Sequence, residues 1–301
     1  MKLRILIVAL FAMALYLKAE KVYKPYILTA ESSKSISELT PDITAALLAN
    51  KFTVEGTYSP ANDNMRKVII VSHPELTKAV QKIGGLSGFA STLRVGLITE
   101  NGKTHVSYTE PEYWCRAYFT EKYSSVEILV KNVTVAFKTS FKKLDGAMYV
   151  AFGCEDGLDA DDLEDYNYMM GMPKFDDTEE LAKYDSQTEA LKTIEANFKK
   201  GVTGVKKVYS YKVPGKNIVL YGVALTGTNG EEKFVPKIDI GQEKHVPFLP
   251  YEFLVVDGKV LMLHGRFRIA LSFPDLTMGT FSKIMSTPGE IEDQIKSAVV
   301  N

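Results

Sequence analysis

The first half of this chain alternates between helical and strand spacing of its hydrophobic residues, and this order predicts an α+β fold. Residues 23–28 form a short strand pattern, and residues 35–50 repeat apolar side chains at helical spacing. Residues 52–58 alternate as a strand, and 67–71 form the apolar run of a buried strand. A shorter helix is predicted after Pro74, because proline is favoured in the first helical turn.

A hairpin and a longer helix come next along the chain. Two strands, 92–99 and 104–108, are joined across Asn101-Gly102, the strongest short hairpin signal. Residues 126–141 are rich in β-branched side chains, which favour a strand, yet their apolar positions repeat at helical spacing. We predict a helix there, because the segment is too long for one strand.

The second half repeats this order after an acidic connector. The predicted helices, strands and hairpin are 188–200, 206–213, 218–225, 253–256 with 260–263 across Asp257-Gly258, and 288–299. The last helix is expected to take the place that the helix after Pro74 has in the first half. The pattern therefore predicts an α+β chain of two similar halves, 20–173 and 174–301. Each half has helices packed on an antiparallel sheet, and an internal duplication is the hypothesis that explains the likeness.

The first nineteen residues have the features of a secretory signal. Charged residues precede an apolar run from 5 to 17, and Lys18-Ala19 closes the segment. Thirteen apolar residues reach about 20 Å as a helix, short of a hydrocarbon core of about 30 Å. We expect cleavage after Ala19, a periplasmic location of the Gram-negative type, and no integral span in the remainder. An uncleaved anchor is the alternative, because Leu17 rather than alanine would stand three residues before the cut.

Composition narrows the classes of partner. The chain has 36 basic and 37 acidic residues, and 46% of its residues are hydrophobic. A nucleic-acid partner is disfavoured, because such proteins usually carry a basic excess that neutralises phosphates. Cys115 and Cys154 are the only thiols; an oxidising compartment would allow them to pair, and two buried free thiols are the alternative.

One block of sequence resembles a known family. Gly85-Leu86-Ser87-Gly88-Phe89, Asn101-Gly102-Lys103 and the stretch Val106-Ser107-Tyr108-Thr109-Glu110-Pro111-Glu112-Tyr113 are similar to the core of the domain of unknown function 302 family. This resemblance implies a compact α+β fold with helices on an antiparallel sheet, often as a homodimer. That family has no established reaction, so the resemblance implies no catalytic residue and no cofactor.

Motifs for common chemistries are missing from the sequence. His73, His105, His245 and His264 form no pair at zinc-ligand spacing. No nucleophile elbow, phosphate-binding loop, dinucleotide fingerprint or Cys-x-x-Cys-His haem motif occurs. A site assembled by the fold stays open, as does the interpretation that these histidines are ordinary hydrogen-bonded side chains.

Three clusters offer candidate chemistry beside a plainer interpretation. Met169, Met170 and Met172 with Cys154 would supply the soft ligands that copper(I) prefers, or would simply pack. The acidic run 156–165 lacks the calcium-loop spacing, so we predict that Asp159 caps a short helix instead. Arg266 and Arg268, predicted on one strand face, would hold an anion or form exposed ion pairs with residues such as Glu252.

These observations favour a periplasmic binding or accessory protein whose halves enclose a pocket for a small molecule or a metal ion. The predicted lining residues are Tyr113, Trp114, Tyr168, Met169, Met172, His264 and Arg266. Two alternatives stay open. One is an enzyme with a dispersed redox or hydrolytic site that uses His264 or Cys154, and the other is a structural or oligomerising envelope protein.

Overall fold

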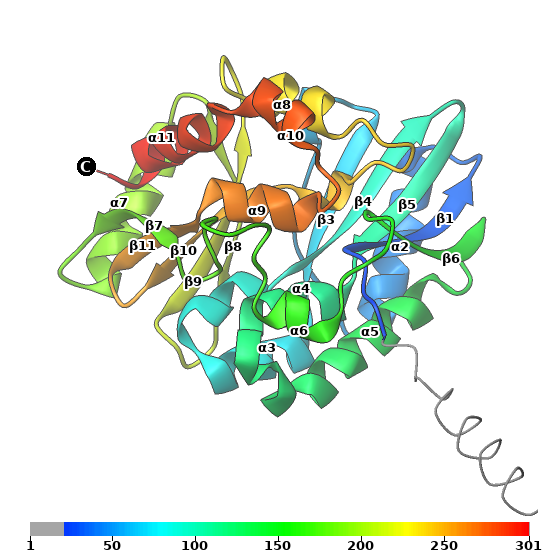
Figure 1. The fold of residues 1–301 in the computed structure, drawn as a ribbon, viewed down its shortest axis with the longest axis horizontal. Helices are drawn as coiled ribbons and strands as arrows, with labels where there is room; N and C mark the ends of the chain where they lie inside the picture. The colour runs from blue at the N-terminus through cyan, green and yellow to red at the C-terminus, as the bar shows by residue number, and fades with distance from the viewer. Residues whose placement is uncertain (1–20, 301) are drawn as a thin grey trace, which may run out of the picture.

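The computed structural model describes residues 21–300, so the predicted signal segment lies outside the described residues. Its first half contains six strands and the helices around them (Figure 1). In chain order these are β1 (Tyr26–Ser32), α2 (Ile36–Ala49), β2 (Thr53–Tyr58), β3 (Arg66–Ser72), α3 (Pro74–Ile83), the 3-10 helix η2 (Gly85–Ala90), β4 (Leu93–Glu100), β5 (Lys103–Thr109), α4 (Pro111–Phe119), α5 (Glu127–Phe141), β6 (Ala147–Phe152) and α6 (Ala160–Glu164).

The second half contains a five-stranded sheet and its own helices. They are β7 (Thr178–Lys183), α7 (Gln187–Lys200), β8 (Val205–Lys212), β9 (Ile218–Leu225), α8 (Glu231–Ile238), the 3-10 helix η4 (Val246–Phe248), β10 (Tyr251–Val256), β11 (Lys259–Leu263), α9 (Gly265–Ser272), α10 (Met278–Phe281) and α11 (Thr287–Val299). Both sheets are antiparallel throughout, so the predicted α+β class with two similar halves is confirmed.

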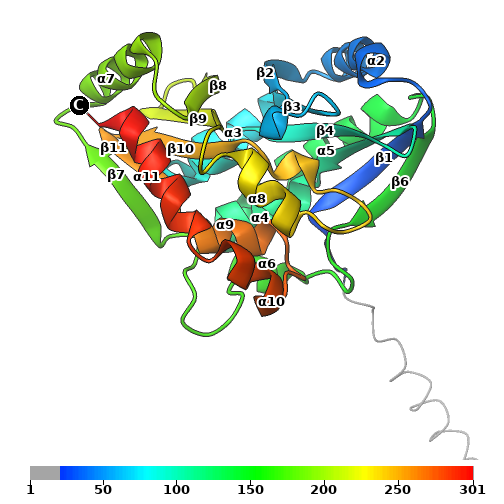
Figure 2. The same cartoon turned by 90° about the horizontal axis from the view of Figure 1, so that it is seen from above.

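The two sheets have the same strand order. The first is β2-β3-β4-β5-β1-β6 and the second, read from the matching edge, is β8-β9-β10-β11-β7. Each begins with a strand and a helix, and in each a helix and a 3-10 segment precede the central hairpin. Figure 2 shows α2 and α7 at opposite outer corners, with β2 and β8 facing each other between them. This repeated order supports the hypothesis of an internal duplication.

Local signals in the sequence set most of these elements. Ser35 and Glu38 form a capping box at the start of α2. The two matching hairpins turn at Asn101-Gly102 and Asp257-Gly258, and all four residues have positive φ. Asn-Gly and Asp-Gly are the pairs that tolerate this backbone best, which fixes the register of both hairpins. The helix predicted over 126–141 is confirmed as α5.

Some predictions are wrong or incomplete. Residues 265–272 form helix α9 rather than a strand, so Arg266 and Arg268 do not alternate on a strand face. Helices α4 and α8 and strands β6 and β7 have no counterpart among the predicted elements. The closing helix α11 packs on α7 as α5 packs on α2, so it corresponds to α5 and not to α3. The predicted division after Pro173 falls in the connection between α6 and β7 and stays a prediction.

The halves meet through a reciprocal exchange of 3-10 segments. Segment η2 of the first half packs on β9 and β10, while η4 of the second half packs on β4 and β5. A glycine lies at each contact. A Cβ on Gly88 would lie 2.6 Å from Leu254 Cδ1, and a Cβ on Gly96 would lie 2.8 Å from Pro247 Cδ. The segments therefore approach more closely than a side chain at either position would allow.

A buried ion pair crosses the same junction. Arg94 of β4 pairs with Glu252 of β10, and both side chains are 3% exposed. Tyr209 of β8 donates its hydroxyl to the same carboxylate and also lies 2.8 Å from the hydroxyl of Thr92. Burial is the largest influence on the pKa of Arg94 and lowers it, but the Glu252 carboxylate together with Tyr209 and Tyr118 raises that pKa above its usual value. The prediction that Glu252 forms an exposed ion pair is therefore wrong.

No helix among residues 21–300 is long and apolar enough to cross a membrane.

We predict that Glu252→Gln lowers the free energy of unfolding by about 3–5 kcal/mol, because it leaves Arg94 charged and unpaired inside the protein. The measurement is urea denaturation followed by circular dichroism. Glu180→Gln is the matched control, because its pair with Lys259 is half exposed and contributes about 0–1 kcal/mol. Equal losses in the two variants would contradict the importance of the buried pair.

Candidate functional site

A cleft of about 500 Å³ lies where the first sheet meets the second half. Its walls come from three segments: β6 with residues 153–155, residues 238–245 between α8 and η4, and the stretch after α9 up to Thr280. The second sheet has no counterpart of β6 beside β7, and the 3-10 segment that matches η4 follows α3 with one intervening residue, Gly84. The cleft is therefore built largely from segments that distinguish the two halves.

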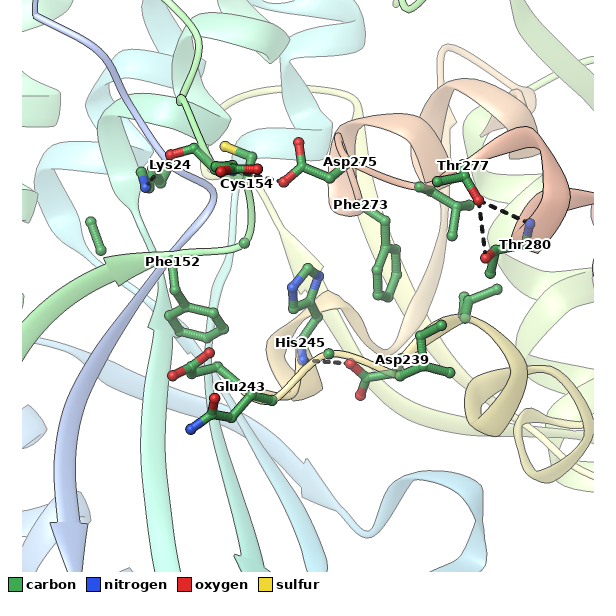
Figure 3. A pocket seen from close by; sticks show the side chains of 18 of the residues that line it. Lys24, Phe152, Cys154, Asp239, Glu243, His245, Phe273, Asp275, Thr277 and Thr280 are labelled. Carbon is green, nitrogen blue, oxygen red and sulfur yellow. Dashed lines mark hydrogen bonds between the residues drawn. The ribbon is translucent and has the colours of Figure 1, made fainter.

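His245 stands in the middle of this cleft, between Phe152 and Phe273 (Figure 3). Its Nδ1 lies 3.0 Å from the carbonyl oxygen of Ser272, which can only accept, so Nδ1 carries the proton and donates. The Nε2 atom then carries a lone pair, and it has no hydrogen-bond partner among the described residues. A neutral imidazole held in this way presents an acceptor to the cleft.

Aromatic rings hold the imidazole in place. It stacks on Phe273 with ring centres 4.5 Å apart, and Tyr26 and Phe152 lie 4.9 and 5.7 Å away. Burial lowers the pKa of His245 to about 4, since these rings offer the charged form little solvation. The side chain is therefore neutral at physiological pH.

The backbone of the same segment is fixed by Asp239. Its carboxylate accepts from the backbone N–H of His245 at 2.8 Å and lies 3.5 Å from Arg66 Nη1. Burial raises the pKa of Asp239 to about 6, although the His245 N–H and Arg66 both favour its charged form. This arrangement ties the loop that carries His245 to the first half.

Carboxylates outnumber cations around the cleft. Among the described lining residues Lys24 is the only one with an ammonium group, and its Nζ donates to the Glu155 carbonyl at 2.7 Å. The carboxylates that line the cleft belong to Asp239, Glu155, Glu243 and Asp275. Asp275 accepts from the backbone N–H of Glu155 at 2.7 Å, which joins two of the walls. The cleft thus presents acceptors more than donors.

One known protein structure has a fold similar to part of this chain. The chain is similar to the crystal structure of an uncharacterized conserved protein of the domain of unknown function 302 (DUF302) from Bacillus stearothermophilus. That match covers 39% of this chain and 97% of the other, at 13% identity and a TM-score of 0.34. No family model and no curated protein matches the sequence. The family of that structure is the one that the sequence resembles, and the likeness concerns the fold alone.

The predicted lining residues do not line this cleft. Tyr168, Met169, Met172 and Arg266 instead line a second, apolar pocket of about 170 Å³ beside α9. Tyr113 and Trp114 are buried in the core, where the Trp114 Nε1–H donates to the Pro25 carbonyl. His264 caps α9, because its Nδ1 accepts from the Arg266 backbone N–H, and its Nε2 lies 3.4 Å from Oε1 of Glu179.

The fold separates the four residues that the sequence suggests as ligands of a soft metal ion. Cys154 lines the His245 cleft, Met169 and Met172 line the apolar pocket, and Met170 is 99% exposed. Within residues 21–300 no group of three or more His, Cys, Asp or Glu side chains could hold a metal ion. The four residues named from sequence therefore do not share one pocket.

The charged clusters are largely structural. Asp159 caps α6 by accepting from the Asp162 N–H, which confirms that prediction. Arg268 is buried and donates to the carbonyls of Phe248 and Pro250, so it does not reach an anion on an exposed face. Its role is to hold η4 and the start of β10 together.

The sequence offers no local signal for the His245 cleft. His245 follows a polar, glycine-containing loop and belongs to no motif. Its partners Asp239, Ser272 and Phe273 come from different elements, and the cleft wall opposite it comes from β6 in the other half. Only the tertiary structure brings these groups together.

Cys115 and Cys154 are free thiols, and both are buried. Burial raises the pKa of Cys154 to about 11, so it is protonated at neutral pH. We predict that Ellman's reagent, added without reductant, labels two thiols per unfolded chain and reacts far more slowly with the folded protein. Finding no reactive thiol after unfolding would show that the two cysteines pair.

We predict that His245 makes the protein less stable as pH falls from about 6.5 to about 4. The folded state keeps the imidazole neutral while the unfolded state takes up a proton, which costs at most about 1.4 kcal/mol per pH unit. Urea denaturation of wild type and His245→Asn across this range isolates the effect, because asparagine still offers the Ser272 carbonyl a donor. An identical pH dependence in both proteins would contradict the neutral, buried imidazole.

Proposed function

We propose that this protein is a small-ligand binding protein and that its ligand occupies the His245 cleft. The observation that carries the proposal is the fixed tautomer of His245, whose Nε2 acceptor faces a cleft of about 500 Å³. This volume lies within the range of about 300–1,000 Å³ that small-molecule sites occupy. Such sites typically place a few fixed polar groups among apolar walls.

The lining suggests the chemistry of the ligand. The carboxylates of Glu155 and Glu243 and the Nε2 of His245 offer acceptors, while Asp239, Asp275 and the ammonium group of Lys24 already have partners within the protein. Phe152, Phe273 and Ile240 provide an apolar surface beside them. An amine with an aromatic or aliphatic body satisfies both features, because its N–H groups donate and its body covers the rings. An anion would face net repulsion there.

We also propose that the protein acts in the periplasm. The charge, apolar run and small residue of the first nineteen positions support export to the periplasm. Free, protonated thiols and the lack of a nucleophile motif give the enzyme alternative no specific support. The homodimer stays a prediction; β6 is the edge strand on which Met148, Tyr149 and Val150 are exposed.

We predict that tyramine, an aromatic amine, binds the purified protein in the cleft and that 4-hydroxyphenylacetate, its carboxylate counterpart, does not. The acidic lining favours the ammonium group and opposes the carboxylate. The measurement is isothermal titration calorimetry, together with the shift of the His245 ring nitrogens by NMR on adding each compound.

The variant His245→Ala should weaken tyramine binding by about tenfold, which corresponds to the loss of one hydrogen bond of about 1.4 kcal/mol. His105→Ala is the matched control, because His105 lies on β5 and does not line the cleft. If the carboxylate binds as well as the amine, the assignment of ligand class is wrong. If neither compound shifts the His245 signals at millimolar concentration, the proposed binding site is wrong.

A further inference from the structure

Four of the ten methionines in the chain line one small apolar pocket. This methionine pocket has a volume of about 170 Å³ and is defined by Met169, Met172, Met278 and Met285 around the side chains of α9. Leu276 is the one residue that it shares with the His245 cleft. The pocket is therefore a second site, and its chemistry is independent of the ligand proposed for the cleft.

The fold brings these methionines together from two distant parts of the chain. Met169 and Met172 lie in the connection between the halves, where a turn with Gly171 at φ 81° joins the Met172 N–H to the Met169 carbonyl at 3.0 Å. Met278 starts α10, and Met285 follows it. The Tyr168 hydroxyl donates to the Leu276 carbonyl at 2.9 Å, which ties the two segments to each other.

Three of these methionine residues are at least 47% exposed. Met169, Met278 and Met285 are 47%, 55% and 58% exposed, although they surround an apolar pocket. Side chains needed only for packing are normally buried, and a contiguous exposed apolar patch marks a site of interaction. These three side chains are thus open to solvent at the pocket.

The chemistry of the donors selects the ligand. Thioether sulfur is soft and uncharged, and soft cations such as copper(I) prefer it over oxygen. The lining residues include no carboxylate, imidazole or thiol, so the pocket offers nothing to hard divalent cations or to zinc. Arg266 is the one charged residue among them, and its exposed side chain leaves that charge in water. A singly charged ion also loses less hydration energy on entry than a divalent one.

We propose that the methionine pocket binds copper(I), or the similar ion silver(I), through the sulfur atoms of Met169, Met172, Met278 and Met285. No redox step is involved, because the ion enters and leaves as the monovalent cation. Of the four soft ligands that the sequence suggests, the pocket keeps Met169 and Met172, while Met278 and Met285 from the second half take the place expected for Met170 and Cys154.

The test is titration of the purified protein with silver(I) in nitrate buffer by isothermal titration calorimetry, with Cys115→Ala and Cys154→Ala present in every protein compared, because free thiols also bind silver(I). The variant with all four residues changed to leucine keeps the apolar surface and removes the sulfurs. We expect it to bind silver(I) at least about tenfold more weakly than wild type. Met65→Leu with Met148→Leu is the matched control, because these exposed methionines lie outside the pocket, and we expect no change.

Two further measurements test whether silver binds at the methionine pocket rather than elsewhere on the protein. Silver binding at the pocket should be independent of pH between about 5.5 and 8, because thioethers do not titrate, whereas a thiol or imidazole site weakens as pH falls. The single variants Met172→Leu and Met278→Leu should each weaken binding, which provides a test if the fourfold variant does not fold. Equal silver affinity in wild type and in the leucine variants, or an affinity that weakens as pH falls, would overturn the proposal.

Discussion

The structure depends on the close contact between the two halves at η2 and η4. Each half sends a 3-10 segment onto the sheet of the other, and Gly88 and Gly96 allow these segments to lie against the facing side chains. The buried ion pair between Arg94 and Glu252 connects the two halves at the same junction. A charge buried there is tolerable only when its partner is in place, so the pair favours one relative position of the sheets.

The two halves share a topology but differ in the segments added to it. The first half adds β6 and α6, and the second adds the longer loop after α8 and the segment after α9. These additions form the His245 cleft and, with the connection between the halves, the methionine pocket. The repeated core thus supplies rigidity, while the segments outside the repeat supply the chemistry.

The two pockets differ in the physical interactions that they offer. The His245 cleft combines a fixed acceptor with carboxylates and aromatic walls, which suits a donor-bearing organic molecule. The methionine pocket offers uncharged, polarizable sulfur and almost no hydrogen bonding. Neither depends on the buried thiols, whose protonation and burial make them poor nucleophiles.

The sequence by itself determined the elements that depend on local interactions. The periodicity of residues 126–141, the capping by Ser35 and Asp159, and the Asn101-Gly102 and Asp257-Gly258 turns each specify a helix or hairpin from neighbours in the chain. Helix α9 was mistaken for a strand because it is buried on nearly all sides, which removes the amphipathic pattern. Both pockets were decided only by the tertiary structure, because His245, β6 and the paired methionine segments meet through contacts that no local spacing encodes.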